Sequence, residues 1–536
     1  MADIIVKLAA GASVALATLV LAAPAQAQNG YSFIDAAKSP INYSIANAKP
    51  QMKCADLRSF SDAETTIIDA QIVSAADGVP EHCRIIGNIL PEVAFEVNLP
   101  SSWNRRFYMS GNGGYAGERP DEPRRVALRN NALRNGFVSA TTNTGHDGVR
   151  EPLGSFAVDR TKLIDYAFRA VHLTATTAKR VAASYYGRSV AYSYWDGCST
   201  GGRQGLMEAQ RFPGDFDGIV AGAPVLNFVD TMVAYTAFIK ALDNAPITMN
   251  KLSVVEAALY AKCDKRDGLA DGLIDDPRRC DFDPARDIPK CSDGRDGADC
   301  LTEAQAATLT EIYRGPRSNG APYFFGFPPG AEKVGVDPAG GPPVRGWDQW
   351  FIGRAGTPSR HFLFSETFFR YLGFGKADPS YDLRRFDIDK DPARLTEMRQ
   401  LMNADNPDLS QFRSRGGKLL MYHGWADPAL TPLMSIDYYE QAQKANGGET
   451  EDFFRLFVVP GMFHCRGGIG VDRIDGLSTI INWVEGSKAP DTIVATQMQD
   501  GKQVRSRLLC PYPRIARLSG NGNADEAASF VCQKPD

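Results

Sequence analysis

The 536-residue sequence predicts an α/β protein whose sheet is mostly parallel and carries helices on both faces. Three observations support this fold class. Short apolar runs alternate with segments of helical periodicity on both sides of residue 200. A glycine-rich turn containing a serine joins one of these runs directly to a helix. The alternation fades after residue 225 and resumes at about residue 416.

The expected strands are apolar runs, rich in β-branched and aromatic residues, that end at turn residues. They lie at 95–99, 106–109, 137–141, 190–195, 218–224, 418–423 and 455–459. Helical periodicity covers 165–186, 204–212, 434–445 and 477–485. Residues 226–415 are rich in Pro, Gly, aromatic residues and Cys, and we interpret them as an inserted lid domain. The core is therefore expected to consist of residues 28–225 and 416–536.

The first 27 residues have the features of an export signal. Lys7 precedes an apolar stretch from Leu8 to Ala23, and 25–27 reads Ala-Gln-Ala, a small-x-small cleavage site. A membrane anchor is the alternative, but the stretch is shorter than the ~20 residues that span a bilayer. We expect cleavage after residue 27 and a secreted or periplasmic protein with no membrane contact. The net charge of −4 and the absence of a basic run also argue against a nucleic-acid partner.

Residues 197–201 read Gly-Cys-Ser-Thr-Gly, which fits the G-x-S-x-G nucleophile motif. The motif needs glycines on both sides because the strand-to-helix turn leaves no room for a Cβ atom. A β-rich run precedes it and a helix follows, so we predict that Ser199 is a nucleophile and not an ordinary turn serine. The N–H of Thr200 would then face an oxyanion. A second donor is expected from the glycine loop at 111–114, from Gly113 or Gly114, although this loop could be a plain turn.

The base and the acid follow from chain order. In α/β-hydrolases the order is Ser, acid, His, which leaves His361, His423 and His464 as candidates. His361 lies in the lid, whereas His464 directly follows the last expected strand. Asp427 follows the strand at 418–423. The sequence therefore predicts an α/β-hydrolase fold with the triad Ser199, Asp427 and His464.

The ten cysteines indicate disulfides, as expected for an exported protein, because no C-x2-4-C spacing suggests a zinc site. Eight of them fall into local pairs: Cys54–Cys83, Cys263–Cys280, Cys291–Cys300 and Cys510–Cys532. Two remain, Cys198 next to Ser199 and Cys465 next to His464. A bond between them requires Cα atoms about 4.4–6.8 Å apart. It would restrain the distance between Ser199 and His464 covalently.

The arrangement Cys198-Ser199, Asp427 and His464-Cys465 resembles the tannase and feruloyl esterase family. The stretch 197–224, the 111–114 loop and the string at 144–146 resemble it too, so that the resemblance covers nearly the whole mature chain. It implies a serine carboxylesterase that forms an acyl-enzyme with an aromatic acid of the feruloyl or galloyl type. The family also includes a hydrolase of mono(2-hydroxyethyl) terephthalate, so a phthalate-type monoester is the alternative substrate. An amidase and a non-catalytic binding module are further alternatives.

The segment 264–275 carries aspartates at spacings of three and four, separated by glycines, a pattern that suits Ca²⁺ although it is not the EF-hand spacing. A solvated Asp/Gly turn is the alternative. The family resemblance implies a structural calcium ion here, closed in by Cys263 and Cys280. The implied ligands are the side chains of Asp264, Asp267 and Asp271 and the backbone oxygens of Leu269 and Leu273.

The lid also contains a cluster of aromatic residues between 347 and 369, most of which we interpret as lid core. A few are expected to line a slot for an aryl ring, among them Phe364. Arg360 and Ser365 resemble positions that hold a free carboxylate in the terephthalate monoester hydrolase. If Arg360 points into the pocket, a charged aromatic monoester is favoured; if it points away, a hydroxycinnamoyl or galloyl ester is. The oligomeric state is left open.

Overall fold

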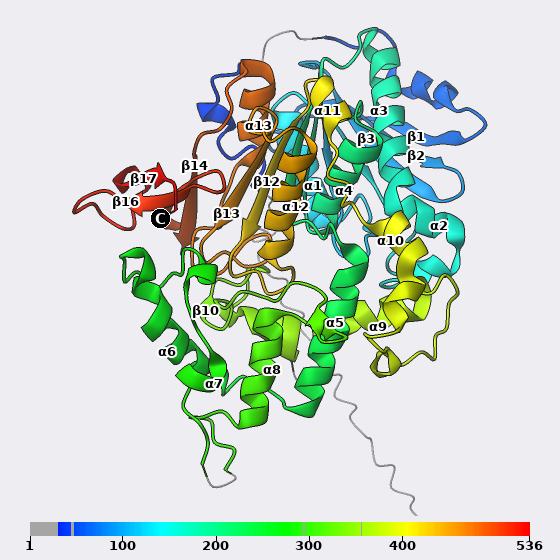
Figure 1. The fold of residues 1–536 in the computed structure, drawn as a ribbon. Helices are drawn as coiled ribbons and strands as arrows, with labels where there is room; N and C mark the ends of the chain where they lie inside the picture. The colour runs from blue at the N-terminus through cyan, green and yellow to red at the C-terminus, as the bar shows by residue number, and fades with distance from the viewer. Residues whose placement is uncertain (1–30, 44–47, 293–294, 355, 536) are drawn as a thin grey trace, which may run out of the picture.

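The computed structural model describes residues 31–43, 48–292, 295–354 and 356–535. The expected export signal at 1–27 lies outside these residues. A nine-stranded sheet runs through the upper part of the molecule in Figure 1. In spatial order its strands are β1 (Thr65–Val73), β2 (His82–Ile89), β3 (Val93–Pro100), β5 (Val138–Thr142), β4 (Arg106–Ser110), β6 (Tyr192–Cys198), β7 (Gly218–Gly222), β12 (Lys418–Gly424) and β13 (Phe454–Val459).

The sheet is parallel from β5 to β13 and antiparallel from β1 to β5. All seven strands expected from the sequence are present, within a few residues of their expected bounds. β1 and β2 were not expected. β1 lies at the edge of the sheet and exposes Ile68 and Ile72, so its burial pattern differs from that of the apolar central strands.

Two sets of helices cover the sheet, and the apolar residues beneath them form two separate clusters. α3 (Ala170–Tyr186), α4 (Thr200–Arg211) and α12 (Pro432–Ala445) pack on one face. α1 (Pro123–Arg134) and α13 (Gly476–Gly486) pack on the other. The prediction of an α/β-hydrolase sheet covered on both faces is confirmed.

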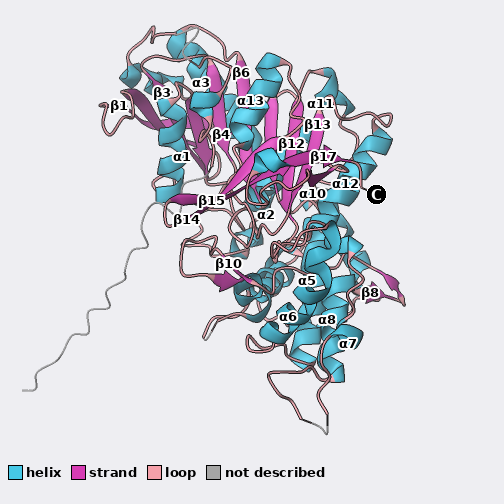
Figure 2. Cartoon of the chain, turned by 90° about the vertical axis from the view of Figure 1, so that its left-hand side faces the viewer, coloured by secondary structure: helices cyan, strands magenta, loops and turns pink. Residues whose placement is uncertain are grey.

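The described residues of the segment between β7 and β12 add no strand to the main sheet. Its longer helices are α5 (Phe228–Asn244), α6 (Leu252–Cys263), α8 (Glu303–Arg314) and α9 (Arg360–Thr367). Two short antiparallel pairs of strands lie among them: β8–β9 (Arg317–Ser318, Ala321–Pro322) and β10–β11 (Val334–Gly335, Val344–Arg345). Figures 1 and 2 both place α5, α6, α7 (Pro284–Asp287) and α8 beyond one end of the sheet.

The last part of this segment returns to the core. α10 (Thr396–Met402) and α11 (Ser410–Ser414) follow the lid helices. Arg203 of α4 donates to the Met402 carbonyl at 3.2 Å, and the Ala404 N–H donates to the Leu226 carbonyl at 2.8 Å. The stretch up to residue 415 that we assigned to the lid therefore includes residues that pack against the nucleophile helix.

Two antiparallel hairpins follow α13 and were not expected from the sequence. They are β14–β15 (Ile493–Gln499, Lys502–Leu509) and β16–β17 (Ile515–Leu518, Phe530–Gln533). Their alternation is weak because many of their side chains are only partly buried. These hairpins contribute Arg505, Arg507 and Arg517 to the acidic loop at 264–275.

All ten cysteines are paired, and the pairs are those expected from the sequence: Cys54–Cys83, Cys198–Cys465, Cys263–Cys280, Cys291–Cys300 and Cys510–Cys532. Four of these bonds are local, and one joins the two parts of the core. Among the described residues, no helix has both the length and the apolar character needed to cross a membrane.

Candidate active site

Ser199 occupies the sharp turn between β6 and α4. Its backbone has φ +63° and ψ −122°, a conformation that costs energy for a residue with a side chain. The turn is held by a hydrogen bond of 2.9 Å from the Ser199 N–H to the Gly222 carbonyl of β7. The strained turn keeps the serine at the end of the sheet, where Ser199 lines a cavity.

The glycines of the motif are required by close backbone contacts. A Cβ atom on Gly197 would lie 2.6 Å from the carbonyl carbon of Gly201, and one on Gly201 would lie 3.1 Å from the Asn112 carbonyl oxygen. The strand, the helix and the 111–114 loop therefore meet without intervening side chains, as the sequence motif predicts.

Asp427 and His464 lie in the loops after β12 and β13. Their side chains form a hydrogen bond of 2.8 Å between Nδ1 of His464 and Oδ2 of Asp427. The other carboxylate oxygen accepts the N–H groups of Ala429 and Leu430, at 2.8 and 2.9 Å. Burial alone would raise the pKa of Asp427, but His464 and His423 hold that pKa well below its usual range. The carboxylate is thus ionised and fixed in orientation.

His423, the rejected candidate base, is also close to Asp427. Its Nε2 lies 3.2 Å from Oδ2 of Asp427, and its Nδ1 lies 2.8 Å from the Ser435 hydroxyl. The imidazole is fully buried and does not line the cavity, whereas His464 does. In this arrangement His423 can position the acid but cannot reach a substrate.

The Cys198–Cys465 bond links the nucleophile turn to the histidine loop. The two Cα atoms are 5.9 Å apart, inside the range that a disulfide permits. Ser199, His464 and the disulfide all line the same cavity, which has a volume of about 460 Å³. The structure thus brings together Ser199 and His464, with Asp427 behind the histidine.

The glycine loop differs from the expectation in one respect. The Gly113 N–H donates to Oε1 of Glu118 at 2.7 Å and is therefore not free to bind an oxyanion. Of the two glycines, Gly114 remains as the candidate donor. The Thr200 hydroxyl donates to the Gly114 carbonyl at 2.6 Å, which fixes this loop to the start of α4.

A buried polar network that the sequence did not reveal supports this loop. Glu118 accepts from the Asn112 amide at 2.7 Å and pairs with Arg125 at 3.1 Å. Burial alone would raise the pKa of Glu118, but Arg125 and these hydrogen bonds lower it, so the carboxylate is ionised. Arg125 also donates to the Gly111 carbonyl at 2.8 Å. No local motif marks such a network, because its members are joined only by the tertiary fold.

The lid supplies an aromatic wall and an arginine to the cavity. Trp350 and Phe364 line it, and the Trp350 ring meets the His464 ring edge-on with centroids 5.3 Å apart. Arg360 also lines the cavity, and its guanidinium carbon lies 5.2 Å from the Trp350 ring centroid. Most of the aromatic cluster is lid core, as expected: Trp347, Phe351, Phe368 and Phe369 are buried.

Ser365 does not fit the role expected for it. Its side chain is fully buried, and its hydroxyl donates to the His361 carbonyl at 2.6 Å, within its own helix. It is not among the residues that line the cavity. A serine in a helix often bonds the carbonyl four residues back, and this local bond takes up the hydroxyl.

Three arginines besides Arg360 also line the cavity, and none of them was predicted from the sequence. Arg124 is the second residue of α1, Arg345 pairs with Glu256, and Arg466 directly follows Cys465. Two carboxylates, Asp196 and Asp337, line the cavity as well, so arginines outnumber carboxylates in its lining. An isolated arginine carries no sequence signal of its own.

The acidic loop at 264–275 lies outside the cavity, between α6 and the C-terminal hairpins. Asp264, Asp267 and Asp271 each accept a backbone N–H of the loop, from Gly272, Leu269 and Leu273 respectively, at 2.9–3.2 Å. Oδ2 of Asp267 is buried with no hydrogen-bond partner among the described residues. A buried carboxylate oxygen without a partner in an aspartate-rich loop suits a hard cation. Asp271 also pairs with Arg507.

Comparisons with known proteins agree with this geometry. The family model for tannase and feruloyl esterase matches residues 78–533. The chain is similar to an uncharacterized esterase of Xanthomonas campestris (34% identity, 94% of this chain and 95% of the relative) and to the mono(2-hydroxyethyl) terephthalate hydrolase of Piscinibacter sakaiensis (32%, 87% of each). Feruloyl esterase B of Aspergillus oryzae is similar in structure, with a TM-score of 0.76 and 26% identity over 90% of this chain and 99% of that one.

Proposed function

The chain belongs to the tannase and feruloyl esterase family and is an ester hydrolase that acts on aromatic esters, and we propose that it does so through an acyl-enzyme on Ser199. The observation that carries this proposal is the disulfide between Cys198 and Cys465. It sets Ser199 beside His464 at one cavity, while Asp427 holds the other side of the imidazole.

The proposed reaction has two steps. His464 accepts the Ser199 proton as the oxygen attacks the ester carbonyl, and the N–H groups of Thr200 and Gly114 stabilise the oxyanion. The alcohol then leaves with the proton from His464. Water, deprotonated by His464, attacks the acyl group and releases the aromatic acid, and Ser199 recovers its proton. Asp427 stabilises the imidazolium in both steps.

The lining of the cavity favours an aromatic acyl group that carries a negative charge. Trp350 and Phe364 offer flat apolar surfaces, and Arg360, which lies over the Trp350 ring, is also part of the lining. A guanidinium binds a carboxylate through two parallel hydrogen bonds. A monoester of an aromatic dicarboxylic acid, such as mono(2-hydroxyethyl) terephthalate, is therefore the preferred candidate over a neutral feruloyl or galloyl ester.

We also propose that the enzyme works outside the cytosol and holds one structural calcium ion. The five disulfides and the signal-like residues 1–27 support export. Asp264, Asp267 and Asp271, with the backbone oxygens of Leu269 and Leu273, would hold the ion. It would stabilise the contact between the acidic loop and the C-terminal hairpins, and it would take no part in the reaction.

The mechanism is tested with Ser199→Ala. This variant should lose essentially all hydrolysis of ethyl ferulate, methyl gallate and mono(2-hydroxyethyl) terephthalate, while its melting temperature stays within a degree or two of wild type. Wild-type enzyme should show a burst of alcohol release and a mass increase on Ser199 of one acyl group. Turnover by the variant, or an acyl group on another residue, would contradict the proposal. A matched ferulic amide tests whether amides are cleaved as well.

The preference for a charged acyl group is tested with Arg360→Gln. We expect kcat/KM for mono(2-hydroxyethyl) terephthalate to fall about 10- to 100-fold, the value of a charge-assisted hydrogen bond, and that for ethyl ferulate to change little. Arg354→Gln is the matched control, because Arg354 pairs with Asp348 and does not line the cavity. An equal fall in kcat/KM for both substrates would show that Arg360 shapes the cavity and does not bind the carboxylate of the substrate.

A further inference from the structure

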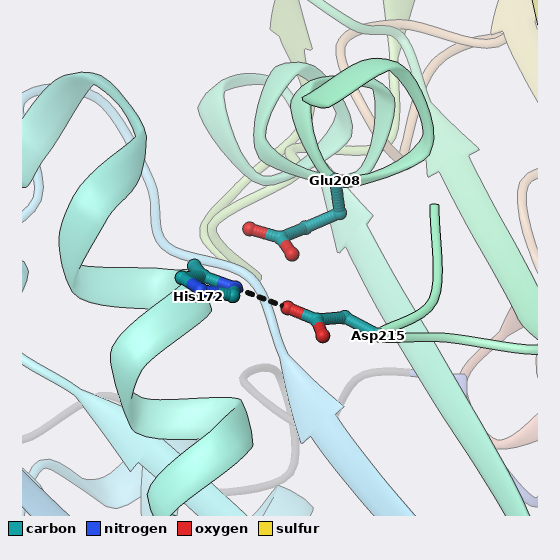
Figure 3. A group of neighbouring side chains, drawn as sticks. All are labelled: His172, Glu208 and Asp215. Carbon is teal, nitrogen blue, oxygen red and sulfur yellow. Dashed lines mark hydrogen bonds and ion pairs between the residues drawn. The ribbon is translucent and has the colours of Figure 1, made fainter. Parts of the chain in front are cut away.

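A second cluster of ionisable side chains lies outside the catalytic cavity, between α3 and α4. It consists of His172 of α3, Glu208 of α4 and Asp215 in the loop that leads to β7 (Figure 3). None of the three lines the catalytic cavity as the structure describes it. One nitrogen and two oxygen atoms, one from each residue, lie within 4.8 Å of one another.

Glu208 is the unusual member of this cluster. Its side chain points toward His172 and Asp215 in Figure 3, and the residue is only 1% exposed. Both of its carboxylate oxygens are buried without a hydrogen-bond partner among the described residues. A buried carboxylate with no partner is strongly unfavourable, because it has lost its water and gained nothing in return. Either a bound cation or a proton on Glu208 would offset this cost.

The other two residues offer ligand atoms in a fixed geometry. Nδ1 of His172 lies 2.6 Å from Oδ2 of Asp215. The His172 ring stacks on the Phe212 ring, with centroids 3.9 Å apart and planes 9° apart, so the imidazole cannot turn freely. The His172 and Asp215 side chains are 29% and 12% exposed, which leaves the site accessible from solvent.

Lys179 is the nearest source of positive charge, but it does not satisfy Glu208. Its ammonium donates to the backbone carbonyl of Asp215 and not to a carboxylate. Among the described residues, no cationic side chain therefore donates to the Glu208 carboxylate.

We propose that His172, Glu208 and Asp215 bind a first-row divalent metal ion such as Zn²⁺. An imidazole nitrogen with two carboxylate oxygens is a donor set that these ions accept, and three protein ligands with water in the open position form a common zinc site. Nδ1 of His172 must carry no proton to bind the ion, so the hydrogen bond between His172 and Asp215 would be replaced by one bond from each residue to the metal. The ion would join α3 to the far end of α4, the helix that starts directly after Ser199.

The proposal is tested on the full-length enzyme. Its metal ions are removed with a chelator, and excess Ca²⁺ is then added so that the acidic loop is occupied by Ca²⁺ throughout. Zn²⁺ is titrated by calorimetry, and Co²⁺ by visible absorption. We expect one Zn²⁺ per chain, a rise in melting temperature, and a Co²⁺ spectrum typical of nitrogen and oxygen ligands. Glu208→Gln and His172→Gln should each weaken binding at least tenfold and abolish the rise in melting temperature.

Asp267→Asn is the control variant, because it alters the acidic loop and should bind Zn²⁺ as wild type does. If Glu208→Gln does not fold, the test rests on His172→Gln, which should fold because His172 is partly exposed. The proposal is overturned if wild type binds no Zn²⁺ at neutral pH, which would mean that Glu208 is instead protonated and shares its proton with Asp215. It is also overturned if both glutamine variants bind Zn²⁺ as tightly as wild type.

Discussion

Cys198 and Cys465 have their Cα atoms 5.9 Å apart, and each is the immediate sequence neighbour of a proposed catalytic residue. The bond closes 267 positions of chain and joins the two parts of the core across the inserted lid. Ser199 and His464 follow different strands of the sheet. The disulfide therefore limits the distance between them even if the lid changes its conformation. Without the disulfide, only many weak packing contacts would maintain that distance.

Removing this bond should therefore affect both stability and catalysis. For Cys198→Ala with Cys465→Ala we expect the free energy of unfolding to fall by about 2–4 kcal/mol. We expect kcat to fall about 10- to 100-fold, since a displacement of about 1 Å at a catalytic group has an effect of this size. Urea unfolding and steady-state kinetics measure the two effects.

The matched control is the double variant Cys291→Ala with Cys300→Ala. That bond spans nine positions in the lid and does not line the cavity. Its loss should leave kcat unchanged. If both double variants lower kcat equally, the effect comes from general destabilisation and the proposed restraint of Ser199 and His464 is wrong.

Asp427→Asn should show that Asp427 acts by orienting and stabilising His464 and not by binding the substrate. An amide in this place retains the shape of the acid but removes the charge that stabilises the imidazolium and can favour the wrong tautomer. We expect kcat to fall by about 10³- to 10⁴-fold with little change in KM. Asp437→Asn, a carboxylate on α12 that does not line the cavity, serves as the control and should be fully active. An active Asp427→Asn enzyme would mean that His464 is held by other contacts.

Chelation should lower the stability of the enzyme without changing its chemistry. With Ca²⁺ at about 100 times its Kd, removing the ion lowers the free energy of unfolding by about 2.7 kcal/mol. EGTA should thus lower the melting temperature of wild type, and Asp267→Asn should have the lower value from the start and not respond. Asp281→Asn is the control, because Asp281 lies near the loop but its side chain is 81% exposed. A wild-type enzyme that ignores both EGTA and Ca²⁺ would contradict a calcium site.

The burial of His361 predicts that the protein loses stability in mild acid. Burial lowers the pKa of His361 from 6.5 to about 3, so the unfolded chain takes up a proton below pH 6.5 while the folded protein does not. Stability is therefore complete above about pH 6.5 and decreases as the pH falls toward 3. Between pH 7 and pH 5 this one group should lower the free energy of unfolding by about 2 kcal/mol.

The measurement compares wild type with His361→Phe by urea unfolding at several pH values. Phenylalanine retains the aromatic stacking on Tyr235, where the ring centroids are 3.8 Å apart, but has no proton to take up. The variant should lose about 2 kcal/mol less than wild type between pH 7 and pH 5. Between pH 7 and pH 9 the two should change in parallel, because His361 is neutral there in both states. Parallel curves below pH 7 would show that His361 is not the group responsible.

Several features of this protein follow from its sequence because they depend on short-range patterns. The turn at Ser199 needs glycines at 197 and 201 for local steric reasons, and apolar runs mark the buried parallel strands. Chain order narrowed the candidates, and position directly after an expected strand selected Asp427 and His464. Cys198 and Cys465 could be paired because every other cysteine had a near partner. The amphipathic signal was too weak for β1, which lies at the edge of the sheet, and for the C-terminal hairpins, which are partly exposed. β2 lies inside the sheet, but it contains Gly87 and Asn88, residue types that are uncommon in strands.

Other features were decided only by the tertiary structure, because they depend on which distant side chains meet. Glu118 takes the Gly113 N–H and leaves Gly114, and the Ser365 hydroxyl bonds within its helix and not to the cavity. The position of Arg360 along a lid helix did not reveal whether its side chain lines the cavity. The sequence by itself determined the fold class and the candidate catalytic residues, since these are set by backbone sterics, by chain order and by position at the ends of strands. Packing in three dimensions decided which of the surrounding polar groups stay free for a substrate.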